Sequence, residues 1–153
     1  MPDMDLWVPG IPAPAGSKKA FYIKKLKRAV VTDACKRTKP WQATVAAFAM
    51  EAWEGKPLLT GPVRAEFVFR LTRSKGHYGS GRNASRLKPS APAYPTGRPD
   101  LLKLTRAVED ALTGIVWADD ALIVHETQEK VYGDRPGVMI RIAEIRLTAE
   151  RNP

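Results

Sequence analysis

The chain has 153 residues, 44% hydrophobic and 27% charged, which suits one domain with a buried core and excludes a disordered basic tail. Its 25 Lys and Arg residues against 16 Asp and Glu give a net charge of +9, which favours a polyanionic partner, nucleic acid before an anionic membrane surface. The single cysteine, Cys35, excludes a disulfide framework. Because we find no leader-like start and no run of about 18 apolar residues, we expect a cytoplasmic protein without a membrane partner.

The first half of the chain predicts a short strand, a basic arm and a helix. Residues 5–8 alternate in polarity ahead of a Pro-rich loop, and residues 20–31 combine basic with β-branched and aromatic side chains, as in a hairpin or an irregular arm. Pro40 opens a helix that reaches about Trp53 and stops at Gly55. Its expected core-facing residues are Trp41, Val45, Phe48, Ala49 and Ala52.

The second half predicts three strands, a long loop and a second helix. Residues 63–71 alternate as a half-buried strand does, and residues 99–113 form a helix that ends before Gly114. Two more strands, residues 122–131 and 138–147, flank a Gly- and Pro-containing turn. We therefore expect a single α+β domain over residues 1–153, with a small mixed or antiparallel sheet and two main helices on one face.

Two segments are strongly basic, and we expect them to form the surfaces that bind phosphate. Residues 18–39 hold nine Lys or Arg and one acid, and the loop of residues 73–98 holds six and no acid. Loops of this length in a compact domain are usually functional or disordered. His77 and Tyr78 lie among the loop's basic residues, where aromatic rings can stack on unpaired bases. The expected DNA-binding residues are Lys18, Lys19, Arg73, Lys75, His77, Tyr78, Arg82, Arg86, Lys88, Arg98 and Lys103.

Carboxylates gather in and after the second helix. At 100° per residue, Asp100 shares a flank with Lys103, Arg106 and Asp110, and Asp119-Asp120 follow a short loop later. If the next strand begins near the start of this helix, Asp100 meets Asp119 or Asp120 and the carboxylates can hold a divalent cation. The alternative is purely structural, with a favourable helix dipole, an Arg106–Asp110 pair and an Asp-Asp turn.

The same segment resembles the RusA-type Holliday-junction resolvases. The resemblance is carried by the string PDLLKLTRAVEDALTGIVWADD, residues 99–120, and extends to GSKKAF, HYGSGRN and the run before Asp100. It implies an α+β homodimer that binds branched DNA and cuts it with Mg²⁺ (or Mn²⁺). It implies catalytic and metal-binding roles for Asp100, Asp119 and Asp120, and places Arg106 where many members have a catalytic lysine.

Leu102 departs from the family pattern, which has a metal-binding aspartate at this position. Three explanations stay open: a loss of activity, a subgroup with leucine here, or another carboxylate in its place. Glu109 lies about 10 Å along the same flank of the helix, which is far for a direct replacement. Glu66 and Glu126, expected on strands, are further candidates.

Three functions therefore compete: a Mg²⁺-dependent junction endonuclease in recombination or repair, a catalytically impaired junction binder, and a basic RNA-binding protein. The two symmetric cuts of junction resolution favour a homodimer. Candidate interface aromatics are Trp7, Phe21 and Trp41.

Overall fold

The computed structural model describes residues 1–16, 18–33 and 35–147. This part of the chain contains two α-helices, six strands and four short 3₁₀ helices. The side chains of residues 18, 19, 32 and 33 lie outside this description, which includes the predicted DNA contacts Lys18 and Lys19. In chain order the elements are β1 (Met4–Pro9), β2 (Lys18–Ile23), β3 (Arg28–Asp33), α1 (Thr38–Ala52), β4 (Val63–Leu71), α2 (Leu101–Leu112), β5 (Ile123–Tyr132) and β6 (Gly137–Glu144).

Four of the strands form one mixed sheet in the order β1-β6-β4-β5. β6 is antiparallel to both β1 and β4, while β5 runs parallel to β4. A parallel pair needs a long crossover, and here the loop of residues 73–98 and α2 provide it. The expected α+β fold with a mixed sheet is confirmed.

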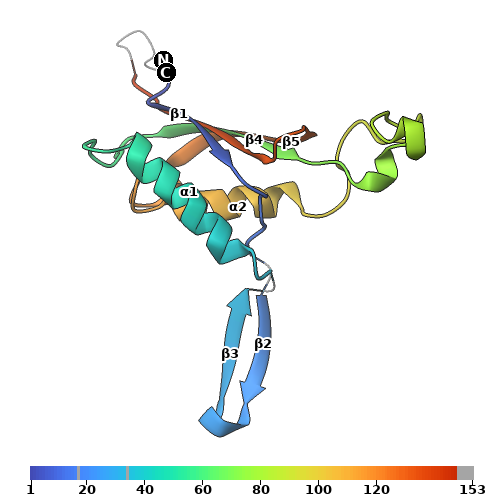
Figure 1. Cartoon of the computed structure of the whole chain (residues 1–153). Helices are drawn as coiled ribbons and strands as arrows, with labels where there is room; N and C mark the ends of the chain where they lie inside the picture. The colour runs from blue at the N-terminus through green and yellow to red at the C-terminus, as the bar shows by residue number, and fades with distance from the viewer. Residues whose placement is uncertain (17, 34, 148–153) are drawn as a thin grey trace.

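Both helices cover the same face of the sheet, and the core lies between them and the strands (Figure 1). The alternation of β4 turns Val63, Ala65, Phe67 and Phe69 inward, and all four are fully buried. The helix residues that meet them include Val45, Leu104, Val108 and Leu112, each 0% exposed. Because truncating a buried phenylalanine to alanine typically costs about 3–5 kcal/mol, Phe67 and Phe69 are major contributors to the stability of the sheet.

The buried stripe of α1 is narrower than predicted. Trp41, Val45 and Ala49 are buried as expected, but Phe48 and Ala52 are exposed. Phe48 lies at the margin of the buried arc, and Ala52 is the last residue of the helix, so neither is covered by α2 or β1. Trp41 is 4% exposed inside its own chain and is therefore not available as an interface aromatic.

Residues 18–33 form a regular hairpin that stands away from the body of the molecule (Figure 1). β2 and β3 pair from Lys18↔Asp33 to Ile23↔Arg28, and Lys27 takes a left-handed conformation (φ 48°) in the connecting turn. An isolated two-stranded hairpin is marginally stable in water. Its exposed Phe21 and Tyr22 and its many cations suit a surface that binds another molecule.

The loop of residues 73–98, predicted as a long surface segment, has defined backbone structure. A short 3₁₀ turn, Lys75–His77, precedes an antiparallel bridge between Tyr78 and Leu87, and a second, Gly81–Asn83, lies in the segment that the bridge closes. At the far end, the Nζ of Lys130 on β5 donates to the carbonyl oxygens of Gly97 (2.7 Å) and Pro99 (2.9 Å). The loop is therefore fastened to the sheet just before α2 begins.

The remaining predicted boundaries differ by a few residues. α2 begins at Leu101 rather than 99, and β6 ends at Glu144, three residues before the predicted end at 147.

In the described part of the chain, none of the helices combines the length and apolarity that crossing a bilayer requires.

Candidate functional site

Asp100 is the residue at which the chain turns into α2. Its backbone is extended (φ −67°, ψ 137°), and its carbonyl oxygen accepts hydrogen bonds from the amides of Lys103 (3.1 Å) and Leu104 (3.0 Å). Its carboxylate makes no capping hydrogen bond to the helix and lies 3.8 Å from the Nζ of Lys103. The carboxylate is thus exposed at a helix N-terminus, available to a ligand.

A pocket of about 420 Å³ opens beside this carboxylate. Its lining comes from the loop after β1, the segments that lead into α1 and α2, and the first turn of α2: Pro14, Cys35, Arg37, Arg98, Pro99, Asp100 and Lys103. Three cations around one acid make it suited to an anionic group. Burial tends to raise the pKa of the Cys35 thiol, but hydrogen bonds with Arg37 and Thr38 and the charge of Arg37 outweigh it and lower the pKa. Arg37 belongs to the basic arm but was not predicted to take part in this site.

Arg106 extends this cationic flank by one turn of α2. Its guanidinium packs over Gly16, whose backbone is left-handed (φ 90°), and a Cβ at position 16 would collide with it. The same segment is fixed to α2 by a hydrogen bond from the Ala15 amide to the Lys103 carbonyl oxygen (2.9 Å). The small residues before Ser17 therefore provide the room in which Arg106 lies.

A second polar group lies along α2 and β5. Pro99 meets Lys130, the Thr105 hydroxyl donates to Oε1 of Gln128 (2.8 Å), and the Gln128 amide donates to Glu126 (3.0 Å). Glu126 in turn shares a hydrogen bond with Glu109. Successive residues of α2 contact residues of β5 with decreasing numbers, so the helix and the strand are antiparallel.

Among these polar residues of α2 and β5, Glu109 is the carboxyl group whose pKa is shifted. Burial, the hydrogen bond and charge of Glu126, and the charges of Asp120 and Asp110 raise its pKa from 4.5 to about 8. Two hydrogen-bonded carboxylates need a shared proton or a cation between them. The end of α2 that lies near Asp120 is therefore acidic, whereas the end at Asp100 is basic.

The structure does not bring Asp100 together with Asp119 or Asp120. Because β5 runs opposite to α2, the residues before β5 lie at the C-terminal end of the helix, whereas Asp100 is its N-terminal cap residue. Asp119 caps a short 3₁₀ turn, Asp120–Leu122, by accepting a hydrogen bond from the Ala121 amide (2.9 Å). The predicted meeting required the strand to begin near the start of the helix, and it begins near the end.

Leu102 is 61% exposed on the outer surface of α2. Thr105 and Glu109 lie one and two turns after Leu102 along the helix, at spacings that place them near the same side. Because Leu102 is exposed, a requirement for burial does not explain a leucine at this position. Of the carboxylates considered as substitutes, Glu66 is on the opposite face of the sheet, 3.9 Å from the Nη1 of Arg141, whereas Glu126 contacts Glu109.

The predicted loop contacts are arranged in two groups. Arg82, Arg86 and Lys88 are exposed near the tip of the loop. Arg73 and His77 instead lie against Tyr132 at the end of β5, with the Arg73 guanidinium 4.1 Å above the ring and the His77 ring 5.5 Å away edge-on. Tyr132 was missed by sequence reasoning because it is 59 positions from Arg73, and a strand-end tyrosine carries no local signal.

A basic hairpin, a basic loop and an acid-bearing helix are typical of proteins that bind nucleic acid through phosphate contacts. The chain matches the family model described as Endodeoxyribonuclease RusA over residues 11–143, nearly its whole length, and it belongs to that family. A comparison with curated proteins finds no match. The family comprises nucleases that act on Holliday junctions.

Resolvases of this family generally depend on a divalent metal. Among the described residues, no group of three or more His, Cys, Asp or Glu side chains is close enough together to hold an ion. A site made by three carboxylates of one chain therefore does not fit. Mg²⁺ also binds through one or two carboxylates with substrate phosphate completing the shell, and the Glu109–Glu126 pair has the donors for that arrangement.

Proposed function

We propose that the chain is a divalent-metal-dependent endonuclease that resolves four-way DNA junctions as a homodimer. The observation that carries the proposal is the family match together with the Asp100 pocket, in which one exposed carboxylate lies among Arg37, Arg98 and Lys103. The net charge of +9 and the acid-free loop supply attraction to the phosphates of branched DNA. Such an enzyme acts where the junctions arise, in the cytoplasm of a bacterium or a phage-infected cell.

The candidate catalytic carboxylates, Asp100, Asp119 and Asp120, lie at the two ends of α2, so in this proposal they have different roles. Since Asp100 lies at the basic end of α2, it faces the phosphate that Arg37, Arg98 and Lys103 attract. Asp120 lies at the acidic end, where its charge acts on Glu109; the Glu109–Glu126 pair is the two-carboxylate metal site of this proposal, with substrate phosphate completing the shell. A bound Mg²⁺ or Mn²⁺ activates water and stabilises charge on the attacked phosphate, and Arg106 adds a fixed positive charge to the same helix.

The second candidate is a junction-binding protein without cleavage activity, which Leu102 favours. The position that carries a metal-binding aspartate in the family here carries an exposed apolar side chain. Both candidates bind branched DNA, so binding does not separate them. Incubation with a labelled four-way junction, first in Mg²⁺ and then in EDTA, does: paired nicks in Mg²⁺ alone support the nuclease, and a stable, uncut complex in both supports the binder.

A further inference from the structure

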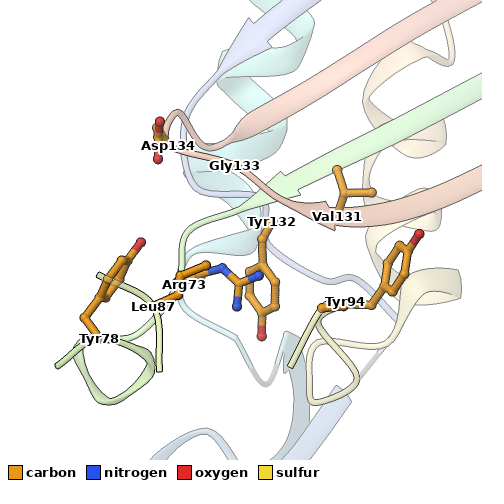
Figure 2. Close-up of a pocket in the computed structure, with 9 residues that line it drawn as sticks. Arg73, Tyr78, Leu87, Tyr94, Val131, Tyr132, Gly133 and Asp134 are labelled. Atoms are coloured by element: carbon orange, nitrogen blue, oxygen red, sulfur yellow. The ribbon is translucent and has the colours of Figure 1, made fainter. Parts of the chain in front are cut away.

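A pocket of about 420 Å³ lies where the loop of residues 73–98 meets the end of β5 and the turn after it (Figure 2). It is lined by Arg73, Tyr78, Leu87, Ala93, Tyr94, Val131, Tyr132, Gly133 and Asp134. Three of these nine residues are tyrosines: Tyr78 and Tyr94 come from the loop of residues 73–98, and Tyr132 ends β5. In Figure 2, Tyr78 and Tyr94 lie on opposite sides of the Arg73–Tyr132 pair.

Hydrogen bonds within the loop hold the walls of this pocket in place. The Gly79 amide donates to the Arg86 carbonyl oxygen (3.0 Å), and the Lys88 amide donates to that of His77 (2.8 Å). Arg73 Nη1 donates to the Pro92 carbonyl oxygen (2.6 Å) while its guanidinium stacks on Tyr132. Because both ends of the loop are fixed to each other and to β5, the pocket exists before a ligand arrives.

The free aromatic surface belongs mainly to Tyr94. Tyr132 is already covered by Arg73 on its face and by His77 at its edge. Tyr94 is 60% exposed, and among the described residues its ring stacks on no other aromatic ring. An exposed tyrosine at the mouth of a pocket is a stacking platform for a flat ring system.

The surroundings select an anionic ligand that carries such a ring. The loop has six basic residues and no acid, and Arg82, Arg86 and Lys88 are exposed beside the pocket's Leu87. Asp134, in the turn between β5 and β6, is the carboxylate among the lining residues and can accept a hydrogen bond from a ring N–H. Phosphate attraction outside and aromatic stacking inside are the combination by which proteins hold single nucleotides of a DNA strand.

We propose that this pocket takes one unstacked nucleobase of the branched DNA, stacked on Tyr94, while the loop's cations hold the flanking phosphates. The inference rests on the proposed function, because it requires that the chain bind junctions. Taking a base out of the stack costs least where the base is unpaired or its stacking is already interrupted. The pocket therefore favours DNA with a branch point over an intact duplex, without reading much sequence.

The test compares Tyr94→Ala and Tyr94→Phe with the wild type and with Phe48→Ala, a control that removes an exposed aromatic ring from α1. Affinity for a four-way junction is measured at several salt concentrations. A second junction carries 2-aminopurine at the branch, whose fluorescence reports stacking. Tyr94→Ala should bind on the order of tenfold more weakly, should leave the salt slope unchanged, and should abolish the fluorescence change seen with the wild type. Tyr94→Phe and Phe48→Ala should behave like the wild type.

The outcomes separate this inference from the function on which it rests. If the wild type binds junctions and Tyr94→Ala matches it in affinity and fluorescence, the pocket does not take a base, although the chain still handles junctions. If Tyr94→Phe is as weak as Tyr94→Ala, stacking is not the interaction and the inference also fails. If the wild type does not prefer junctions to duplex, the proposed function and the inference fail together.

Discussion

Glu109 on α2 and Glu126 on β5 are hydrogen-bonded carboxyl groups, and burial together with this neighbour raises the pKa of Glu109 to about 8. Their hydrogen bond joins a helix to an edge strand of the sheet. It gives the pair both a pH dependence and a capacity to exchange the proton for a metal ion.

Stability should fall as pH rises from about 4.5 to about 8. The folded chain holds the Glu109 proton to a pKa of about 8, whereas the unfolded chain releases it near 4.5. In this window the native state binds more protons, and stability declines with pH until both states have lost them. We expect the melting temperature in EDTA to decline across the window, and Glu109→Gln, which keeps a neutral side chain, to flatten the decline. An equal slope in Glu109→Gln would contradict the assignment.

Adding Mg²⁺ at pH 8 should raise the melting temperature if the pair holds a cation, because a ligand that binds the native state alone stabilises it. Glu126→Gln should remove this increase. The matched control is Glu66→Gln, which neutralises a strand carboxylate on the other face of the sheet. A Mg²⁺ response that survives in Glu126→Gln would place the ion elsewhere.

Asp120→Asn should reduce cleavage of a four-way junction by at least about 100-fold, since Asp120 acts on the proposed metal pair and metal-assisted catalysis contributes several kcal/mol. Asp100→Asn should also reduce cleavage, because Asp100 lies beside the cations that hold the phosphate. Junction affinity should stay the same or increase, because a negative charge beside phosphate is removed. Single-turnover cleavage and a binding titration measure the two effects separately. Should Asp120→Asn cut as fast as the wild type, the acidic end of α2 is not the catalytic end.

Leu102→Asp tests whether the missing carboxylate matters. Since Leu102 is exposed, the change should fold normally. Activity should rise if leucine is a lesion, and should stay flat or fall if Glu109 and Glu126 already supply the donors. Measuring Leu102→Asp with and without Glu109→Gln decides between these. In the second case Glu109→Gln alone is inactive, and Leu102→Asp restores part of its activity.

Neutralising Arg82, Arg86 and Lys88 together should lower the slope of log affinity against log salt by up to about three, at about 0.9 for each lost phosphate contact. Arg64→Gln, a change at an exposed position on β4, is the control and should leave the slope unchanged. An unaltered slope in the triple variant would show that the DNA lies on another surface. Competition with duplex RNA in the same assay should be weak.

Light scattering at micromolar concentration should give twice the chain mass of 16.9 kDa. The expectation comes from the need for two symmetric cuts. Of the interface aromatics considered, Phe21 is 47% exposed on the hairpin, and Phe21→Ser should shift the mass towards that of the monomer. A wild-type mass of 16.9 kDa would count against the dimer.

The sequence predicted the elements well, because their signals are local. The alternation of residues 63–71 reproduces β4 to the residue, and Asp100 was placed correctly at the start of α2. The separation of Asp100 from Asp120 was not predictable. It follows from β5 pairing parallel to β4, a long-range choice that no short pattern encodes. The contact of Tyr132 with Arg73 depends on the same pairing.

The fastening of the loop of residues 73–98 at both ends has a consequence for how this scaffold can diversify. Arg73 is fixed by Tyr132 and Pro92, and Lys130 holds the carbonyl groups of Gly97 and Pro99. Changes of length or sequence between these anchors should leave Asp100 in place, because Lys130 holds the two carbonyl groups that precede α2. Exchanging the loop between relatives should therefore transfer the preference for a DNA shape. The candidate catalytic residues on α2 and β5 should keep their positions.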